Sequence, residues 1–140
     1  MSKGFRIIGI ICALLVVAII VLWFMIAERS GRISQLNSFA AAGNANAPRM
    51  IDDVTRLEGV SVEYPAVVFH YTFVVPADMV DLTLLESRER LWFQEDACAN
   101  EQVMATVLEP GYEIVRSYQD SQQNVVLQLR LGIEQCQPGT

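Results

Sequence analysis

The chain has 140 residues, a formal net charge of −6 and three cysteines. This length accommodates one membrane segment and one small folded domain. From Ile33 onward, six arginines stand against 15 carboxylates, a net charge of −9, and there is no lysine. An acidic surface repels phosphate backbones and anionic headgroups, which disfavours nucleic-acid binding and polybasic attachment to lipid.

An apolar run, IIGIICALLVVAIIVLWFMIA, occupies residues 7–27 and carries no charge. A helix of this length spans roughly 31 Å, close to the ~30 Å hydrocarbon core of a bilayer. The run is longer than the apolar region of a cleaved signal peptide, and Glu28-Arg29 follows it instead of a small-residue cleavage site. We therefore expect an uncleaved single-pass transmembrane helix at 7–27, preceded by a short cytoplasmic lead at 1–6.

The direction of this helix is inferred from the cysteines. Two basic residues flank each end of the run, so the positive-inside rule gives nearly a tie. Cys98 and Cys136 are the only cysteines beyond the run. An isolated pair in a small extracytoplasmic domain most often forms a disulfide, and two free buried thiols are the alternative. The expected location is the bacterial inner membrane, with a cytoplasmic amino terminus and a periplasmic domain.

The stretch KGFRIIGII, where the lead meets the helix, resembles the start of type IV pilin-like proteins. In that family a peptidase cuts after Gly in a K-G-F-T-L-I-E pattern, which Gly4 and Phe5 match. Gly9 stands where the pattern has the Glu that contributes to filament assembly. The Ser30-Gly31 pair is expected to interrupt the long helix that a pilin would continue. A pilin-like subunit processed after Gly4 remains an alternative.

Residues 28–47 are rich in Ser, Ala, Asn and Gly, a composition that predicts a stalk, helical at first and then flexible. The folded domain is expected from residue 48 to about Cys136, with a short tail to residue 140. This leaves roughly 90 residues, enough for one modest core.

Four segments of this domain alternate between two faces, as strands do: 55–64, 66–75, 112–118 and 125–133. Neither face of 66–75 is strongly polar, so this segment is expected to be a central strand that is covered on one face and partly covered on the other. The first two segments precede the expected helices, and the last two follow them as a hairpin.

Two helices are expected between these strand pairs. Thr83 and Glu86 have the spacing of a capping box for the first helix, and Asn100 can cap the second, which Pro110 would end. The expected apolar stripe of the first helix consists of Leu84, Leu85, Leu91 and Trp92. The order strand-strand-helix-helix-strand-strand predicts an α+β fold, with helices on one face of an antiparallel sheet.

The soluble part also resembles a group of small, mostly uncharacterised bacterial envelope proteins. The group shares a P-x-x-x-D-x-x-T-R-L start, a Y-x-Y-T-like strand, a mid-domain Cys and a G-x-x-x-x-x-x-Y…C ending. Here these features are PRMIDDVTRL, FHYTFVV with Phe69 in place of the first Tyr, Cys98, and the segment from Gly111 to Cys136. The resemblance implies an envelope location and a Cys98–Cys136 bridge, and it implies no activity.

No constellation of catalytic residues stands out. His70 is the only histidine and lies within an expected strand, where a packed or interfacial role is more common than that of a base. The carboxylate pairs Asp52-Asp53 and Glu95-Asp96 are more typical of solvated or capping residues than of a metal site. We expect no catalytic residues, no metal and no cofactor, and a hydrolase that uses carboxylates remains an alternative.

Three residues are candidate contacts with a partner: Arg56, Trp92 and Phe93. Arg56 could instead form a structural ion pair with Asp52, Asp53 or Glu58. Adjacent helical positions point about 100° apart, so Trp92 and Phe93 cannot both lie fully within one core stripe. One of them could be exposed, and exposed aromatic side chains often anchor interfaces.

An anchor, a stalk and a compact acidic domain without a catalytic constellation together favour a membrane-anchored periplasmic module that binds another protein. An accessory subunit of an envelope machine and an immunity-type inhibitor of an exported toxin both fit this description. Residues 7–27 would make the membrane contact, and the partner would be a protein outside the cytoplasm.

Overall fold

The computed structural model describes residues 2–137, with side chains from residue 13 onward. Gly4, after which a pilin-like protein would be processed, precedes the residues whose side chains are described. Residues 138–140, most of the expected tail, lie outside the described residues. The chain divides into two compact units, Met1–Ser34 and Gln35–Thr140, each of which is described by itself.

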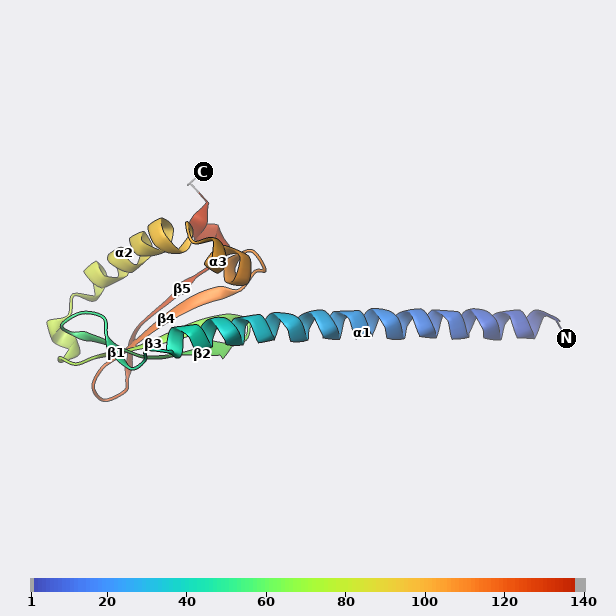
Figure 1. The fold of residues 1–140 in the computed structure, drawn as a ribbon, viewed down its shortest axis with the longest axis horizontal. Helices are drawn as coiled ribbons and strands as arrows, with labels where there is room; N and C mark the ends of the chain where they lie inside the picture. Colours follow the sequence, from blue (N-terminus) through green and yellow to red (C-terminus); the bar gives the residue numbers. More distant parts are fainter. Residues whose placement is uncertain (1, 138–140) are drawn as a thin grey trace. The chain divides into compact units, whose positions relative to one another are not determined.

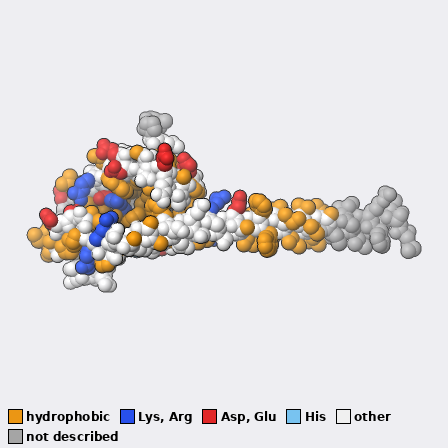
Figure 2. All heavy atoms as spheres, viewed as in Figure 1, with side chains coloured by type: hydrophobic (Ala, Val, Ile, Leu, Met, Phe, Trp, Pro, Cys, Tyr) orange, Lys and Arg blue, Asp and Glu red, His pale blue; other side chains and the backbone are white. Residues whose placement is uncertain are grey.

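Helix α1 (Ser2–Asn44) is a single element of 43 residues that contributes to both units. In the first unit its described apolar side chains, such as Trp23 and Phe24, are exposed. Hydrophobic side chains cover this stretch on the face that Figure 2 shows. From Ala13 to Asn44 the mean hydropathy reaches 2.1, and none of the most apolar window is buried. The helix is therefore long and apolar enough to cross a membrane, a criterion that a signal sequence also meets.

The helix continues through Ser30 and Gly31, where the sequence predicts an interruption. A glycine within a helix costs only about 1 kcal/mol relative to alanine. No atom lies within 4 Å of the position that a Cβ of Gly31 would take, so no tertiary contact requires glycine there. The expected flexible second half of the stalk is therefore helical as far as Asn44.

The last turns of α1 belong to the folded unit. Leu36, Phe39 and Ala40 recur at helical spacing and form an apolar stripe. Leu36 is fully buried and Ala40 is 6% exposed, both within the main core. The folded unit thus begins near Gln35, and the expected boundary at residue 48 is too late, because burial of this stripe extends the core into the predicted stalk.

Five strands form one sheet in the order β1-β2-β3-β4-β5 (Figure 1). Their bounds are β1 (Arg49–Met50), β2 (Thr55–Glu63), β3 (Ala66–Phe73), β4 (Glu113–Gln119) and β5 (Val125–Leu131). The four predicted strand segments are therefore confirmed, with ends that differ from the prediction by one or two residues. The α+β fold is confirmed as well, and the sheet is mostly antiparallel.

One strand pair departs from the expected antiparallel sheet. β3 and β4 pair in parallel, in a register that sets Val67 beside Ile114 and Tyr71 beside Tyr118. A parallel neighbour requires a long crossover, and the helices between β3 and β4 supply it. β3 is thus the central strand, with Val67, Tyr71 and Phe73 buried on one face.

The helices of the crossover cover one face of the sheet (Figure 1). They are η1 (Ala77–Met79), α2 (Leu82–Trp92), the π-helical turn η2 (Phe93–Ala97), α3 (Glu101–Val103) and the π-helical turn η3 (Met104–Leu108), while η4 (Ile133–Cys136) follows β5. The prediction of helices on one face is confirmed. Asn100 caps α3, because its Oδ1 accepts hydrogen bonds from the backbone amides of Gln102 and Val103 at 3.0 and 3.1 Å.

The cap of α2 differs from the predicted Thr83–Glu86 box. Asp81 is the N-cap residue, and its Oδ1 accepts a hydrogen bond from the backbone amide of Leu84 at 3.0 Å. Thr83 already lies inside the helix, where its carbonyl accepts a hydrogen bond from the hydroxyl of Ser87. A carboxylate at the N-cap serves the same free amides and also interacts favourably with the helix dipole.

The inward face of α2 also differs from the predicted stripe. Leu84 and Leu91 are exposed, at 66% and 53%, whereas Leu85, Glu89 and Phe93 are buried. The buried residues are spaced by four, as one helical face requires. The predicted stripe consists of apolar residues alone, so it does not include Glu89, which faces inward because it pairs with Arg116.

A disulfide joins Cys98, just after η2, to Cys136 in η4, with a Cα–Cα distance of 5.4 Å. The predicted bridge is thus present. It connects the helical layer to the end of β5 beside the main core.

The core between the helices and the sheet has two parts, and a third, small cluster of Ala66, Val68 and Val115 lies on the other face of the sheet. The closed end contains twelve buried residues: Leu36, Ala40, Val60, Val67, Phe93, Ala97, Val107, Leu108, Tyr112, Ile114, Leu129 and Leu131. The open end contains five: Leu57, Tyr71, Phe73, Leu85 and Tyr118.

Asn44, the last residue of α1, binds the edge of β2. Its side-chain amide donates a hydrogen bond to the carbonyl of Val60 and accepts one from the amide of Val60, both at 2.7 Å. β1 pairs with β2 only at Leu57 and Arg56. The Asn44 side chain therefore takes the place of a neighbouring strand where β1 does not reach, and it satisfies two backbone groups.

Candidate functional site

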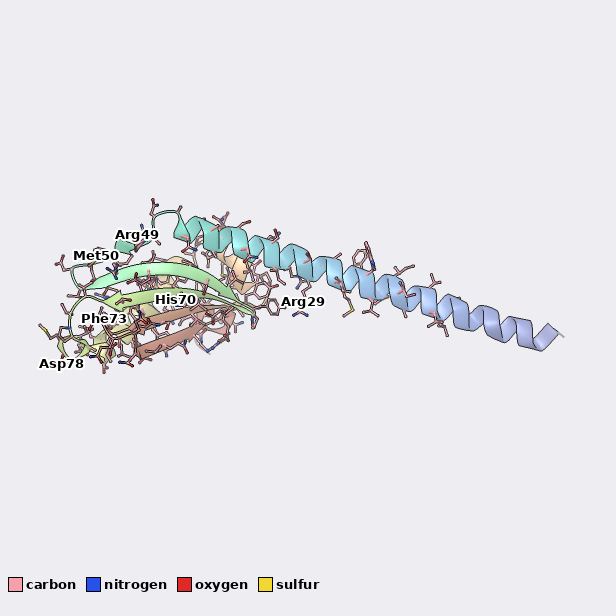
Figure 3. All side chains as sticks on the ribbon, turned by 90° about the horizontal axis from the view of Figure 1, so that it is seen from below. Arg29, Arg49, Met50, His70, Phe73 and Asp78 are labelled. Carbon is pink, nitrogen blue, oxygen red and sulfur yellow. A yellow bond between two sulfur atoms is a disulfide. The ribbon has the colours of Figure 1, made fainter. Side chains whose placement is uncertain are left out.

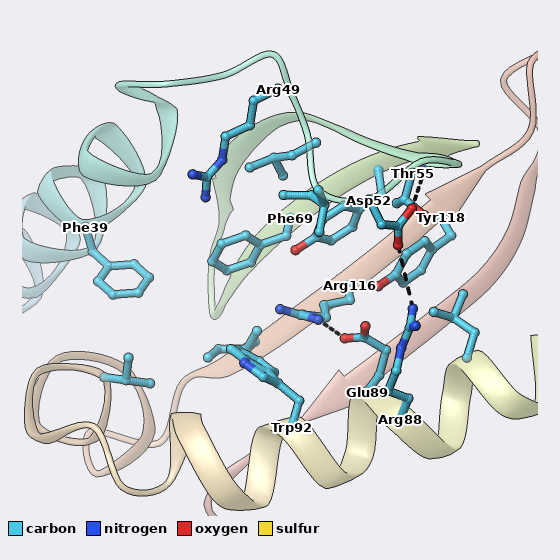
Figure 4. Close-up of a pocket in the computed structure, with 16 residues that line it drawn as sticks. Phe39, Arg49, Asp52, Thr55, Phe69, Arg88, Glu89, Trp92, Arg116 and Tyr118 are labelled. Carbon is cyan, nitrogen blue, oxygen red and sulfur yellow. Dashed lines mark hydrogen bonds and ion pairs between the residues drawn. The ribbon is translucent and has the colours of Figure 1, made fainter. Parts of the chain in front are cut away.

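A hollow of about 300 Å³ lies between α2 and the sheet at the open end (Figure 4). Its walls are formed by aromatic, aliphatic and charged side chains, and the charged groups come from β1, the loop after it, α2 and β4. The aromatic residues are Phe39, Phe69, Tyr71, Trp92 and Tyr118, and the charged residues are Arg49, Asp52, Arg88, Glu89 and Arg116. This volume lies at the small end of the range for ligand sites.

An ion pair between Arg116 and Glu89 occupies the centre of the hollow (Figure 4). Arg116 lies between Ile114 and Tyr118 in the alternation of β4, so it faces the helices with these two residues. Glu89 follows Leu85 by one helical turn. The two side chains are only 13% and 10% exposed. Burial of a charge on each partner is tolerated because the two charges compensate.

Aromatic rings surround the guanidinium of Arg116. Its Cζ lies 3.8 Å from the ring centroid of Trp92 and 5.5 Å from that of Tyr71. Tyr71 stacks on Tyr118 with a centroid distance of 4.7 Å, and Phe73 extends the stack. The negative faces of the rings stabilise the cation and keep water from one of its sides.

One donor of Arg116 has no partner. Its Nε is buried, and no residue that the structure describes accepts a hydrogen bond from it. A guanidinium carries five N–H donors, and Glu89 cannot engage all of them. A buried donor without an acceptor costs about 1–3 kcal/mol, so this atom is poised to gain from an added acceptor.

Burial raises the pKa of both tyrosines in the hollow. The pKa of Tyr71 and that of Tyr118 lie above the ordinary value because desolvation disfavours the phenolate, and the charge of Arg116 opposes this only in part. Both hydroxyls are therefore neutral at physiological pH. A neutral hydroxyl can donate a hydrogen bond to a ligand.

Two further arginines lie at the rim of the hollow. Arg88 Nη2 is 3.8 Å from Asp52 Oδ2. The other oxygen of Asp52 accepts hydrogen bonds from the backbone amides of Val54 and Thr55 at 2.9 and 2.7 Å. Arg49 is exposed and forms no ion pair with any residue from 13 to 137. Asp52 and Glu89 are thus both engaged by neighbours.

Exposed apolar side chains adjoin these arginines. Ile51 lines the hollow, and Met79 and Leu84 line a shallower depression beside it that shares Asp52 and Arg88. Ile51, Met79 and Leu84 are 50%, 73% and 66% exposed. Figure 2 shows basic and hydrophobic side chains interspersed on this face of the domain. Such patches mark surfaces that interact with other molecules.

Of the three predicted contact residues, only Trp92 lies in the hollow. Phe93 is fully buried in the closed end, so this residue packs in the core and is not available to a partner. Arg56 forms an ion pair with Glu58, at 2.7 Å, which is one of the structural pairs that its sequence neighbours allow. Arg56 does not line the hollow.

Sequence reasoning missed Arg116 and Glu89. The available signal was a charged residue on the apolar face of a strand, since Arg116 alternates in step with Ile114 and Tyr118. A charge in that register requires either a buried partner or a ligand.

His70 lies on β3, on the opposite face of the sheet from the hollow (Figure 3). Its Nε2 is 2.8 Å from the hydroxyl oxygen of Ser61. The same hydroxyl donates a hydrogen bond to the carboxylate of Glu63 at 3.4 Å. Glu63 thus contacts the serine and not the imidazole. A serine triad requires the acid to orient the histidine, and this arrangement does not do so. Among the described side chains, no three His, Cys, Asp or Glu residues lie close enough together to hold a metal ion.

Two solved structures share the fold. The pilotin EpsS of the type 2 secretion system from Vibrio vulnificus aligns with a TM-score of 0.61 and 16% identity, over 80% of this chain and 96% of its own. A protein from Pseudomonas aeruginosa, described provisionally as secreted, aligns with a TM-score of 0.60 and 17% identity, over 74% of this chain and 91% of its own. At this identity the likeness shows the fold alone. No family model and no curated protein sequence matches the chain.

Proposed function

We propose that the protein is a membrane-anchored periplasmic module that binds another protein and acts as an accessory subunit of an envelope machine. The observation that carries this proposal is the hollow of the open end, with Arg116 and Trp92 inside and the exposed side chain of Ile51 at its rim. Tryptophan and arginine are the residues most enriched where protein interfaces gain their affinity.

The likeness to EpsS supports the same proposal, because that protein is a pilotin of a secretion system. The apolar part of α1 supports membrane attachment by its length and composition. The Cys98–Cys136 bridge supports an oxidising compartment, and hence a periplasmic domain and a cytoplasmic amino terminus. An immunity-type inhibitor would use the same hollow and the same anchor.

Site-specific photo-crosslinking in cells tests partner binding. A photoreactive residue is placed at Ile51, which lines the hollow, or at Leu91, which is similarly exposed on α2 but outside the hollow. We expect an adduct with one defined protein from position 51 and none from position 91. Equal labelling from both positions, or no adduct from position 51, would contradict the proposal.

A fusion of alkaline phosphatase to the carboxy terminus tests the orientation, because this enzyme is active only where its disulfides form. We expect an active fusion, and an electrophoretic shift on reduction that the variant Cys136→Ser lacks. An inactive phosphatase fusion together with an active cytoplasmic reporter would reverse the proposed orientation.

A pilin-like subunit is a second candidate, favoured by one observation. The expected break at Ser30-Gly31 does not occur, and α1 runs without interruption from Ser2 to Asn44. The replacement of the family's Glu by Gly9 argues against a filament-forming role. Mass spectrometry of the mature protein decides between the two: residues 1–4 still attached would exclude processing after Gly4.

A further inference from the structure

The hollow is a basic site within an acidic domain. Its lining includes three arginines, Arg49, Arg88 and Arg116, and two carboxylates, Asp52 and Glu89. The other three arginines of the chain from residue 33 onward stand against 13 carboxylates. Half of the basic residues of this part of the chain therefore surround one small concave surface, where they favour a negatively charged ligand.

Arg116 can accept such a ligand without losing its internal partner. Glu89 engages Nη1, while the buried Nε has no acceptor among the described residues. A planar guanidinium presents more than one edge to carboxylates, so one anion at Nη1 leaves donors for a second. Trp92 and Tyr71 hold the guanidinium in place. The guanidinium is therefore already ordered in the free protein, so ligand binding does not have to restrict its motion further.

The rim and walls define the rest of the ligand. Figure 4 shows the side chain of Arg49 turned toward the hollow, and this residue forms no ion pair with the side chains that the structure describes. The walls beside Arg116 are the rings of Trp92 and Phe69. A ligand that satisfies these groups carries a negative charge next to an apolar group. With about 300 Å³ available, it is the size of a few side chains.

We propose that the hollow binds an acidic side chain of the partner protein, with its carboxylate on Arg116 and a flanking apolar side chain on Trp92. This inference rests on the proposed function and specifies the chemistry of the partner: an exposed segment in which Glu or Asp adjoins Leu or a similar residue.

The charge of Glu89 then lowers the affinity of Arg116 for the partner's carboxylate, although Glu89 keeps its place. Its carboxylate already neutralises Arg116, so it weakens the attraction for a second carboxylate. Replacement by the isosteric glutamine removes the competing charge and keeps the shape of the side chain. The variant Glu89→Gln is therefore expected to bind an acidic ligand more tightly than the unaltered protein does, a gain that a purely structural ion pair would not produce.

The fluorescence of Trp92 provides the measurement. The chain has two tryptophans, so Trp23→Phe in the full-length protein, in detergent micelles, leaves Trp92 as the only one. The probes are two blocked peptides, acetyl-Ser-Leu-Glu-Leu-Ala-Ser-amide and its counterpart with Gln in place of Glu. We expect the Glu peptide to bind with a Kd at least about tenfold lower than that of the Gln peptide, since each tenfold corresponds to only ~1.4 kcal/mol.

Three variants identify the residues responsible. Glu89→Gln should widen the difference between the peptides about threefold or more, and the double variant Glu89→Gln/Arg116→Gln should abolish it. The double variant leaves no buried charge unpaired, so it should fold, which circular dichroism verifies. Arg130→Gln removes an exposed arginine that pairs with Glu113 outside the hollow, and it should change nothing.

Equal binding of the two peptides, no change in Trp92 emission, or weaker binding of the Glu peptide by Glu89→Gln would each overturn the inference. A response to decanoate without one to the Glu peptide would assign the hollow to a lipid carboxylate and would overturn it as well. If any of these results occurs while position 51 still gives its adduct in cells, the proposed function stands and only this inference fails.

Discussion

The closed end and the open end of the core lie between the same sheet and the same helical layer, yet they are built differently. At the closed end, Phe93, Val107 and Leu108 are fully buried, and the Cys98–Cys136 bridge lies beside them. At the open end, the helical layer presents Glu89 to Arg116 and leaves a hollow of about 300 Å³.

This difference has a physical cause. Apolar side chains at the closed end approach one another without penalty, and dispersion and desolvation favour complete packing. A guanidinium and a carboxylate retain a desolvation cost even when paired, so complete burial at the open end would gain little. The closed end therefore supplies stability, and the open end leaves polar groups available for a ligand.

The largest expected effect is at the closed end. Phe93→Ala should lower the free energy of unfolding by about 3–5 kcal/mol, because it leaves a cavity in a fully packed region. Urea unfolding of the full chain, followed by Trp92 emission in the Trp23→Phe background, measures this loss. Leu91→Ala, two residues earlier and exposed, should cost less than about 0.5 kcal/mol. Equal losses would show that the closed end is not the stabilising part.

Removal of the disulfide should have the next largest effect. Cys98 and Cys136 are 38 residues apart, and a loop of this size contributes about 4 kcal/mol in the chain-entropy model, with typical measured values of about 2–4. The variant Cys98→Ser/Cys136→Ser should unfold at correspondingly lower urea concentration, and a reducing agent should affect the unaltered protein alone. Unchanged stability of the double variant would remove the bridge from the account of the closed end.

Replacing one member of the buried ion pair should lower the free energy of unfolding, whereas replacing both members should not. Arg116→Met leaves Glu89 buried without its partner and should cost about 3 kcal/mol, at the low end for a buried pair because the hollow admits water. Arg116→Met/Glu89→Leu should recover most of this loss or exceed the original stability. Urea unfolding compares the variants. A double variant as unstable as the single one would mean that the pair itself holds the open end together.

The smallest expected effect concerns the edge of β2. Asn44→Ala removes both hydrogen bonds to Val60 and should cost about 1–2 kcal/mol, discounted because the site is partly exposed. Amide hydrogen exchange at Val60 should accelerate, since its N–H loses its acceptor. Asn37→Ala, on the exposed side of the same helix, is the control and should leave this exchange unchanged. Protection at Val60 that survives Asn44→Ala would require another partner for this edge.

Much of the fold could be predicted from local patterns. Alternation located all four long strands, and the isolated pair of Cys98 and Cys136 indicated the bridge. Helical spacing indicated two helices, of which Asn100 caps the second as predicted, while the cap and the inward face of α2 differ from the prediction. The parallel pairing of β3 and β4 could not be predicted in the same way, because alternation describes the faces of a strand and not the direction of its neighbour.

The site was largely beyond local reasoning. Trp92 was predicted as a contact and lies in the hollow, whereas Phe93 beside it is buried in the core. Helical geometry separates these two directions but does not say which one faces the sheet. The tertiary structure decides it, because Leu85, Glu89 and Phe93 together form the face that is buried against the sheet.

The sequence by itself determined the features whose physics is local: an apolar run of transmembrane length, an acidic α+β domain and its strand periodicity. The tertiary structure alone decided where that domain begins, since burial of Leu36 brings the end of α1 into the core. It also decided that Arg116 and Glu89 meet in a hollow, because their encounter depends on a crossover between two parallel strands and not on any spacing along the chain.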